Sequence, residues 1–133
     1  MDMQAQRVEA APRRNSEWQD ALRRCRAYRR RNLDISQQVT ALHVAPAFSC
    51  IEITDPLYNT LMRREPAGDY RDVFLMSKGH GCMIQYVILQ EQGVLSQQDI
   101  ADYCKPNGRL GAHPDYETPG ISASTGSLGH GLG

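Results

Sequence analysis

One stretch of the chain decides the fold class that we expect, and it reads Val73-Phe74-Leu75-Met76-Ser77-Lys78-Gly79-His80-Gly81. Its first four residues form an apolar run between polar neighbours, which is typical of a short strand buried on both faces in a parallel sheet. Apolar residues at helical spacing follow over residues 83–88, and Gly93 is placed to end that helix. A strand, a glycine-rich turn and a helix in this order predict an α/β fold.

The turn after the predicted strand has the composition of an anion-binding site. Gly79 and Gly81 flank His80, and glycine lets a backbone approach a ligand closely. The helix that follows presents free N–H groups and the positive end of its dipole, which favour an anion such as a phosphate. The imidazole of His80 can hydrogen-bond the same anion, although a histidine that only caps a helix gives the same pattern.

Two further segments carry candidate binding residues. In Gly111-Ala112-His113-Pro114, the proline restricts the backbone of His113 and would hold its imidazole in one direction. Glycines and small hydroxylated residues follow over residues 118–131, where backbone amides can cradle an anion or a flat polar ring. That segment is neither a Walker P-loop nor a Gly-x-Gly-x-x-Gly turn, and by itself it also fits a flexible linker.

The N-terminal part of the chain differs in charge from the rest. Residues 1–31 hold nine Arg and four acidic residues, whereas residues 32–133 hold six basic and eleven acidic residues, for a formal net charge of zero. Because most of the chain is acidic, a protein that coats nucleic acid is excluded. The Arg residues over 23–31 are read as the solvated face of a helix, with an RNA-binding or partner-protein surface as the alternative.

That basic helix is predicted to follow a flexible tail at residues 1–15. Ser16 and Gln19 form a capping-box pattern, which places the start of the helix at Ser16. An apolar stripe follows at helical spacing and is expected to be buried: Trp18, Leu22, Cys25 and Tyr28. Beyond Pro46, a second helix is expected to start at Ser49 or Thr54.

Length and composition exclude several classes of protein. The chain has 133 residues, which is a prior for one domain, and no apolar run approaches the roughly 18 residues of a membrane span. Its four cysteines are not spaced as a zinc clip, so they are read as free thiols in a reducing compartment. No secretory signal opens the chain, so a cytoplasmic location is expected.

The order and spacing of the three glycine- and histidine-bearing segments resemble the amino-terminal portion of transketolases. The likeness covers about residues 20–133 and is greatest to the separate N-terminal subunit of split transketolases. It implies a Rossmann-like three-layer domain that binds thiamine diphosphate together with Mg²⁺ or another divalent metal. It also implies an enzyme that transfers a two-carbon ketol unit between sugar phosphates.

The resemblance also implies roles for individual residues. His80 would contact the diphosphate, His113 would face the reacting carbon and the substrate hydroxyls, and His43 would lie on the substrate side. Three residues would lie against the aminopyrimidine and thiazolium rings, largely through their backbone: Gly126, Ser127 and Leu128. The metal ligands of the family lie in a Gly-Asp-Gly motif that does not occur in this sequence, so no metal ligand is assigned to this chain.

Residues 16–133 are therefore expected to be the N-terminal part of a truncated domain, mostly helical with one clear strand at 73–76. Alone, this part would be inactive. The missing domains or a C-terminal transketolase subunit would complete it in a homo- or hetero-oligomer. Around His43, residues 42–49 depart from the family pattern, which leaves open a thiamine diphosphate enzyme with a different acceptor. A non-catalytic interaction or RNA-binding module that uses the Arg-rich helix 23–31 is the other alternative.

Overall fold

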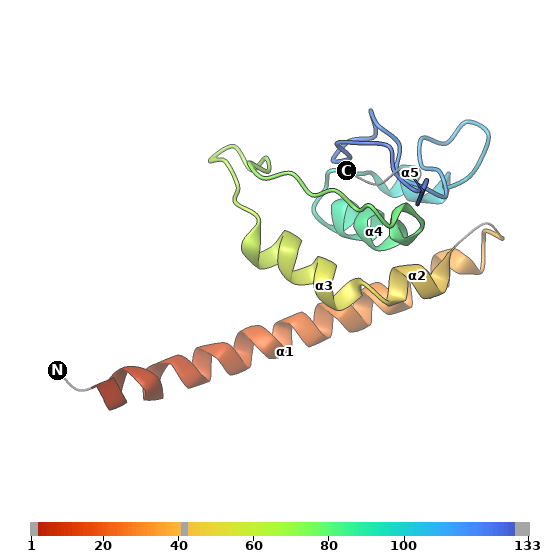
Figure 1. Ribbon diagram of the computed structural model, residues 1–133. Coiled ribbons are helices and arrows are strands. Elements are labelled where there is room, and N and C mark those ends of the chain that lie inside the picture. The colour runs from red at the N-terminus through yellow and green to blue at the C-terminus, as the bar shows by residue number, and fades with distance from the viewer. Residues whose placement is uncertain (1–2, 41–42, 130–133) are drawn as a thin grey trace.

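The structure is a computed structural model that describes residues 3–40 and 43–129, with side chains described from residue 16 onward in these ranges. Helical segments make up the regular structure of the described residues (Figure 1). In chain order they are α1 (Met3–Ser36), α2 (Val44–Phe48), α3 (Ile51–Pro56), the π-helical turn η1 (Leu57–Leu61), the 3₁₀ turn η2 (Gly79–Gly81), α4 (Met83–Glu91) and α5 (Gln97–Ala101).

Helix α1 runs along one side of the molecule, and its N-terminal turns extend past the other elements (Figure 1). Its later turns contact α2, α3 and α4. The predicted start at Ser16 was wrong, because Ser16 lies inside a helix that begins at Met3. A helix assignment does not test the flexibility that we predicted for residues 1–15, which stays a prediction. None of the helices in the described ranges combines the length and the apolar character that a membrane span requires.

Two prolines shape the chain after α1. Pro46 lies in the first turn of α2, where its missing N–H leaves no hydrogen bond unmade. Pro56 ends α3 and is followed by the π-helical turn η1, in which the Met62 N–H donates to the Leu57 carbonyl at 2.8 Å. The predicted start of this second helix at Ser49 or Thr54 was wrong, because the chain forms two short helices around Ser49 instead.

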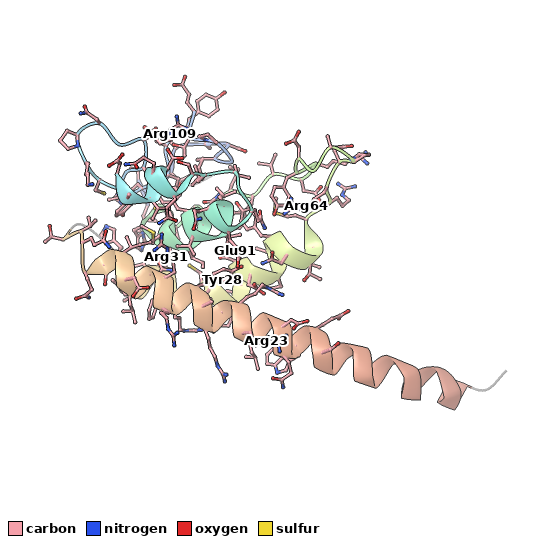
Figure 2. The ribbon with its side chains drawn as sticks, turned by 180° about the vertical axis from the view of Figure 1, so that it is seen from behind. Arg23, Tyr28, Arg31, Arg64, Glu91 and Arg109 are labelled. Carbon is pink, nitrogen blue, oxygen red and sulfur yellow. The ribbon has the colours of Figure 1, made fainter. Side chains whose placement is uncertain are left out.

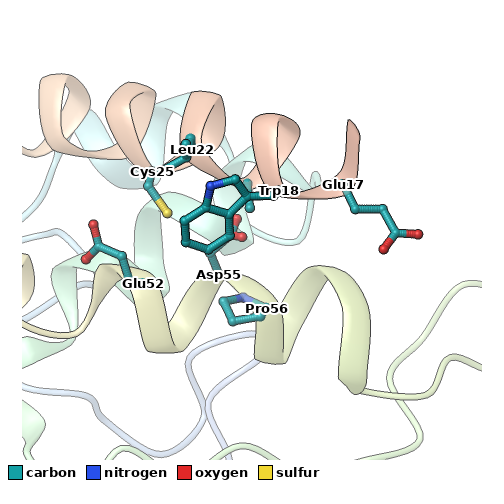
Figure 3. A pocket seen from close by; sticks show the side chains of 8 residues that line it. Glu17, Trp18, Leu22, Cys25, Glu52, Asp55 and Pro56 are labelled. Atoms are coloured by element: carbon teal, nitrogen blue, oxygen red, sulfur yellow. The ribbon is translucent and has the colours of Figure 1, made fainter. Parts of the chain in front are cut away.

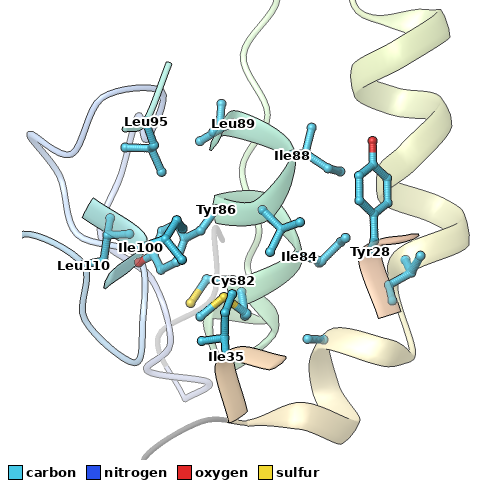
Figure 4. Close-up of a cluster of buried hydrophobic side chains, with 14 of the residues drawn as sticks. Tyr28, Ile35, Cys82, Ile84, Tyr86, Ile88, Leu89, Leu95, Ile100 and Leu110 are labelled. Carbon is cyan, nitrogen blue, oxygen red and sulfur yellow. The ribbon is translucent and has the colours of Figure 1, made fainter. Parts of the chain in front are cut away.

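Helix α4 is the centre of the core (Figure 4). Every side chain from Met83 to Leu89 is buried, so this helix must be covered on all sides, and α1, α2, α3 and α5 contact it. Gly93 ends the helix as predicted, with a positive φ of 76°. The N–H of Val94 donates to the Leu89 carbonyl at 2.9 Å, which completes a Schellman motif.

The predicted strand at 73–76 was wrong for the described part of the chain. Residues 73–76 are not assigned to a strand, and the β contact that the structure shows is an isolated antiparallel bridge between Arg64 and Tyr70. Burial on both faces was also wrong, because Val73 is 68% exposed whereas Met76 is 8% exposed. A run of apolar residues forms a strand only when another strand pairs with it. The expectation of a mostly helical chain is confirmed, and the three-layer α/β arrangement is not seen within residues 3–40 and 43–129.

A buried network of polar side chains joins α1 to α3 and α4. The carboxylate of Asp55 is fully buried and accepts two hydrogen bonds from Arg24, Nε to Oδ1 at 2.7 Å and Nη2 to Oδ2 at 2.9 Å. The Tyr28 hydroxyl donates to Glu91 Oε2 at 2.6 Å, and Figure 2 shows these two side chains close together behind the ribbon. Burial and the bond to Glu91 raise the pKa of Tyr28, so its hydroxyl stays a proton donor.

We expect Arg24→Met to destabilise the chain by about 3 kcal/mol, because it leaves the Asp55 carboxylate buried without its cation. Chemical denaturation followed by circular dichroism measures this free energy of unfolding. The matched control is Arg23→Met, which removes an exposed pair with Asp20 and should cost less than about 1 kcal/mol. Equal losses in the two variants would contradict the importance of the buried pair.

Candidate functional site

Three histidines that lie far apart in the sequence come together in the structure. His43 is the N-cap residue of α2, His80 lies in η2, and His113 lies in the loop before Pro114. The ring centroids of His43 and His80 are 5.8 Å apart, and those of His43 and His113 are 5.5 Å apart. We call these three residues the histidine cluster. The site residues predicted from three separate segments therefore share one place, while the roles assigned to them stay predictions.

Gly79 allows the segment around residue 125 to lie directly on the η2 turn. A Cβ atom at Gly79 would be 2.7 Å from the Cα and N atoms of Gly126, which is closer than van der Waals contact allows. The Thr125 hydroxyl donates to the Met76 carbonyl at 2.7 Å and fastens the two segments at the same point. Only glycine fits at position 79 without moving the backbone of residues 125–126.

Gly126 in turn lies against the ring of His113. It has a φ of 121°, a conformation that favours glycine, and a Cβ there would be 2.6 Å from Cδ2 of His113. The Tyr86 hydroxyl, from the core helix α4, donates to the His113 carbonyl at 3.0 Å. The position of His113 is thus set from one side by the core and from the other by Gly126.

Ser127 and Leu128, the other two residues predicted to bind the cofactor, follow Gly126 directly. Both side chains are exposed, and Leu128 is 66% exposed, so neither packs into the core. Their closeness to the histidine cluster comes from the backbone of Gly126. The helix start that the sequence indicates near Thr125 was wrong, since residues 124–127 are not helical.

The surroundings of His80 favour its neutral form. Burial lowers the pKa of His80 below its usual value of 6.5, and the positive charges of Lys78, His43 and His113 lower it further. A neutral imidazole carries one N–H donor and one acceptor, so it can hydrogen-bond an anion or a hydroxyl. His43 and His113 are exposed and His80 is half-buried, which leaves all three rings accessible to a ligand.

Sequence reasoning missed two residues that support the cluster. The sequence pattern indicates Tyr86 only as part of a buried helix, but a buried tyrosine hydroxyl needs a partner, and this requirement was the available signal. Lys78 lies two residues before His80, and its ammonium group reaches the segment that follows His43. No pattern in the sequence indicated that contact, because Lys78 and Pro46 are 32 positions apart.

The basic face of α1 is largely engaged with this chain's own carboxylates. Arg24 pairs with Asp55, and Arg29 pairs with Glu52 on α3. Arg26 and Arg30 are exposed on the same helix. The pattern fits the solvated and packed helix face better than a dedicated RNA surface, because two of its cations serve the contact between α1 and α3.

A separate apolar groove lies between α1 and α3 (Figure 3). Its volume is about 290 Å³, and its lining includes Trp18, Leu22, Cys25 and Pro56. Trp18 is 61% exposed there, so the prediction that it is buried with the rest of the apolar stripe was wrong. The histidine cluster does not line this groove.

Metal binding has no support in the described residues. Within residues 3–40 and 43–129, no group of three or more His, Cys, Asp or Glu side chains is arranged to hold a metal ion. The four cysteines are free thiols, as expected. The chemistry that the cluster offers is therefore that of imidazoles and backbone amides around a glycine-lined contact.

A diphosphate group fits these features. Gly79 and Gly126 have no space for a Cβ atom, so backbone rather than side chain forms the surface beside His80 and His113. Imidazole N–H groups and the ammonium group of Lys78 are the donors that phosphate oxygens accept. The flat rings of a cofactor would lie against exposed backbone near Gly126.

Comparison with known proteins supports this interpretation. Residues 21–133 match the family model described as transketolase, thiamine diphosphate binding domain. The match covers most of the chain and includes the whole histidine cluster.

Curated relatives are similar over a part of their length. The chain is 34% identical over 106 residues to the chloroplastic transketolase of Spinacia oleracea, a match that covers 75% of the chain and 14% of that protein. It is 36% identical over 107 residues to one of the two-part apulose-4-phosphate transketolases, in the subunit from Phocaeicola vulgatus, covering 78% of the chain and 38% of that protein. The corresponding protein of Actinobacillus succinogenes is 34% identical over 94 residues. The chain spans well under half the length of these relatives.

We expect Gly79→Ala to displace residues 125–126 and with them the ring of His113, because the new Cβ would overlap backbone atoms. The imidazole signals of His80 and His113 in NMR spectra should shift, and the thermal midpoint should fall. Gly129→Ala is the matched control, since a Cβ at Gly129 would meet nothing within 4 Å. Unchanged histidine signals in Gly79→Ala would show that this contact does not shape the site.

The lowered pKa of His80 makes a prediction about pH. The folded chain binds fewer protons at His80 than the unfolded chain does, so this group's contribution to stability is complete above pH 6.5. It is lost as the pH falls through the folded pKa. We expect NMR titration to place the His80 pKa below 6.5, and His80→Gln to flatten the fall in the free energy of unfolding over this range. A His80 that titrates at or above 6.5 would contradict the prediction.

Proposed function

The chain belongs to the transketolase family, and on that premise we propose that it supplies the diphosphate-binding part of a ketol-transferring enzyme. The whole enzyme would use thiamine diphosphate to transfer a two-carbon ketol unit between sugar phosphates. The observation that carries the proposal is the convergence of His43, His80 and His113 on the contact between Gly79 and Gly126.

His80 is the proposed diphosphate ligand. Its neutral ring can donate one N–H to a phosphate oxygen, and the glycines beside it let the backbone approach the same group. Gly126, Ser127 and Leu128 would lie against the aminopyrimidine and thiazolium rings, with Leu128 offering an exposed apolar side chain to them. When bound, thiamine diphosphate supplies the electron sink for the reaction, and the protein supplies orientation.

His113 and His43 are the proposed substrate-side residues. Both rings are exposed, and an imidazole exchanges protons near neutral pH, which suits groups that hydrogen-bond substrate hydroxyls and hold a proton during transfer. Tyr86 fixes the backbone of His113, so its ring direction is preset before a substrate binds. The divergent segment around His43 favours, as a variant of the same proposal, an acceptor that differs from that of typical transketolases.

The remaining parts of the site would come from outside this chain. A divalent metal such as Mg²⁺ would be held by ligands on further domains or on a partner, because no metal ligand is assigned here. Two of the relatives are named as transketolase subunits, which supports a hetero-oligomer whose partner is a C-terminal transketolase subunit. We therefore expect the 133-residue chain to lack ketol-transfer activity by itself.

The experiment compares the chain alone with the chain mixed with a C-terminal transketolase subunit. Calorimetric titration with thiamine diphosphate and Mg²⁺ measures cofactor affinity, and a coupled assay with a ketose phosphate donor and an aldose phosphate acceptor measures turnover. We expect cofactor binding and turnover only in the mixture. His80→Gln should weaken cofactor binding by about tenfold, the effect of losing one hydrogen bond to a charged group.

The control variant is Arg26→Gln, which alters the exposed basic face of α1 and leaves the histidine cluster intact. It should bind the cofactor as the unaltered chain does. Stoichiometric cofactor binding and turnover by the chain alone would overturn the need for a partner. Absence of cofactor binding in the mixture, together with salt-dependent RNA binding that Arg26→Gln weakens, would favour the RNA-binding alternative.

A further inference from the structure

Lys78 bridges two of the segments that carry the histidine cluster, and we infer that it is a positioning residue that holds His43 beside His80. Its Nζ donates to the Pro46 carbonyl at 3.1 Å and also to the Ser49 hydroxyl. Both acceptors lie on the short segment that His43 begins, whereas Lys78 itself directly precedes the η2 turn. One side chain thereby connects the start of α2 to the turn that carries His80.

The segment that Lys78 holds has little stability of its own. Helix α2 has five residues, and a helix this short does not persist in water without tertiary contacts. His43 makes no side-chain hydrogen bond to the cap of α2, so its ring is placed by where the helix start lies. The position of His43 therefore depends on the ties between α2 and its neighbours, and the ammonium group of Lys78 makes two of them.

Close packing at the same interface makes the lysine bridge directional. A Cβ at Gly81 would be 3.1 Å from the sulfur atoms of Cys50 and Met76, so the η2 turn and the end of α2 already approach closely. Cys50 Sγ shares the Pro46 carbonyl as acceptor, also at 3.1 Å. Lys78 thus acts where α2 and η2 have almost no free space, and its loss would let α2 move only away from His80.

The charge of Lys78 has a second effect on the cluster. The groups that face His80 are Lys78 from its own segment, His43 from α2 and His113 from the loop before Pro114. After burial, Lys78 is the largest of the charges that lower the pKa of His80. Removing this lysine should therefore both loosen His43 and make His80 easier to protonate, two changes that a merely structural contact elsewhere would not produce together.

This inference rests on the proposed function only for what the histidines bind. The arrangement that it describes belongs to the chain without a ligand, so its tests contain no thiamine diphosphate. A failed test of Lys78 would leave the proposed function standing, and a failed cofactor titration would leave the role of Lys78 standing.

The first test uses the two lysines of the sequence as a matched pair. Lys78→Met keeps a flexible side chain and removes the charge, whereas Lys105→Met removes a cation whose partner is Asp102. NMR titration of the imidazole signals should show a raised His80 pKa and shifted His43 signals in Lys78→Met, and no change in Lys105→Met. Ser49→Ala keeps the charge and removes one acceptor, so it should shift His43 signals while leaving the His80 titration largely in place.

The second test needs no variant and covers the case in which Lys78→Met fails to fold. Folded chain is treated briefly with an amine-acylating reagent, and mass spectrometry measures the extent of reaction at Lys78 and Lys105. We expect Lys78 to react about tenfold more slowly, since its amine must first leave two acceptors, and the two rates should converge in denaturant. Equal rates in the folded chain, or a Lys78→Met variant with unchanged His43 and His80 signals, would overturn the inference.

Discussion

The structure depends on the burial of one short helix. Helix α4 exposes no side chain between Met83 and Leu89, and a helix of this kind is stable only when other elements cover it completely. Helices α1, α2, α3 and α5 provide that cover. Because the η2 turn leads directly into α4, the packing that buries the helix also determines where His80 lies. The Tyr86 hydroxyl extends the same control to the backbone of His113.

The opposite charges of the two parts of the chain meet where the cover is attached. Arg24 on α1 reaches the fully buried carboxylate of Asp55 on α3, and Arg29 reaches Glu52 on the same helix. A buried carboxylate with a well-placed guanidinium fixes one relative position of two helices, whereas apolar contacts tolerate sliding. The basic composition of residues 1–31 therefore has an intramolecular use that accounts for part of it without a nucleic acid.

What the sequence predicted correctly is mostly what short segments decide among themselves. The helix end at Gly93 and the capping box of Ser96 and Asp99 need only a few neighbouring residues, and both are present in the structure. The strand at 73–76 failed because a strand needs a partner that no local pattern supplies. The start of α1 and the exposure of Trp18 failed for a related reason, since how far a helix runs and which side it buries depend on what covers it.

The candidate site was easier to predict than the fold around it, and the glycines explain why. His80 and His113 attracted attention through their glycine and proline neighbours, and the structure shows that such glycines mark places where backbone segments touch. At Gly79 and Gly126 two segments approach too closely for any side chain, and the Thr125 hydroxyl fastens them to Met76. Contacts between backbones, supported by a lysine bridge, thus do here what a sheet does in an α/β fold. They bring loops that are distant in the sequence to one edge, and they leave the rings of His43 and His113 exposed.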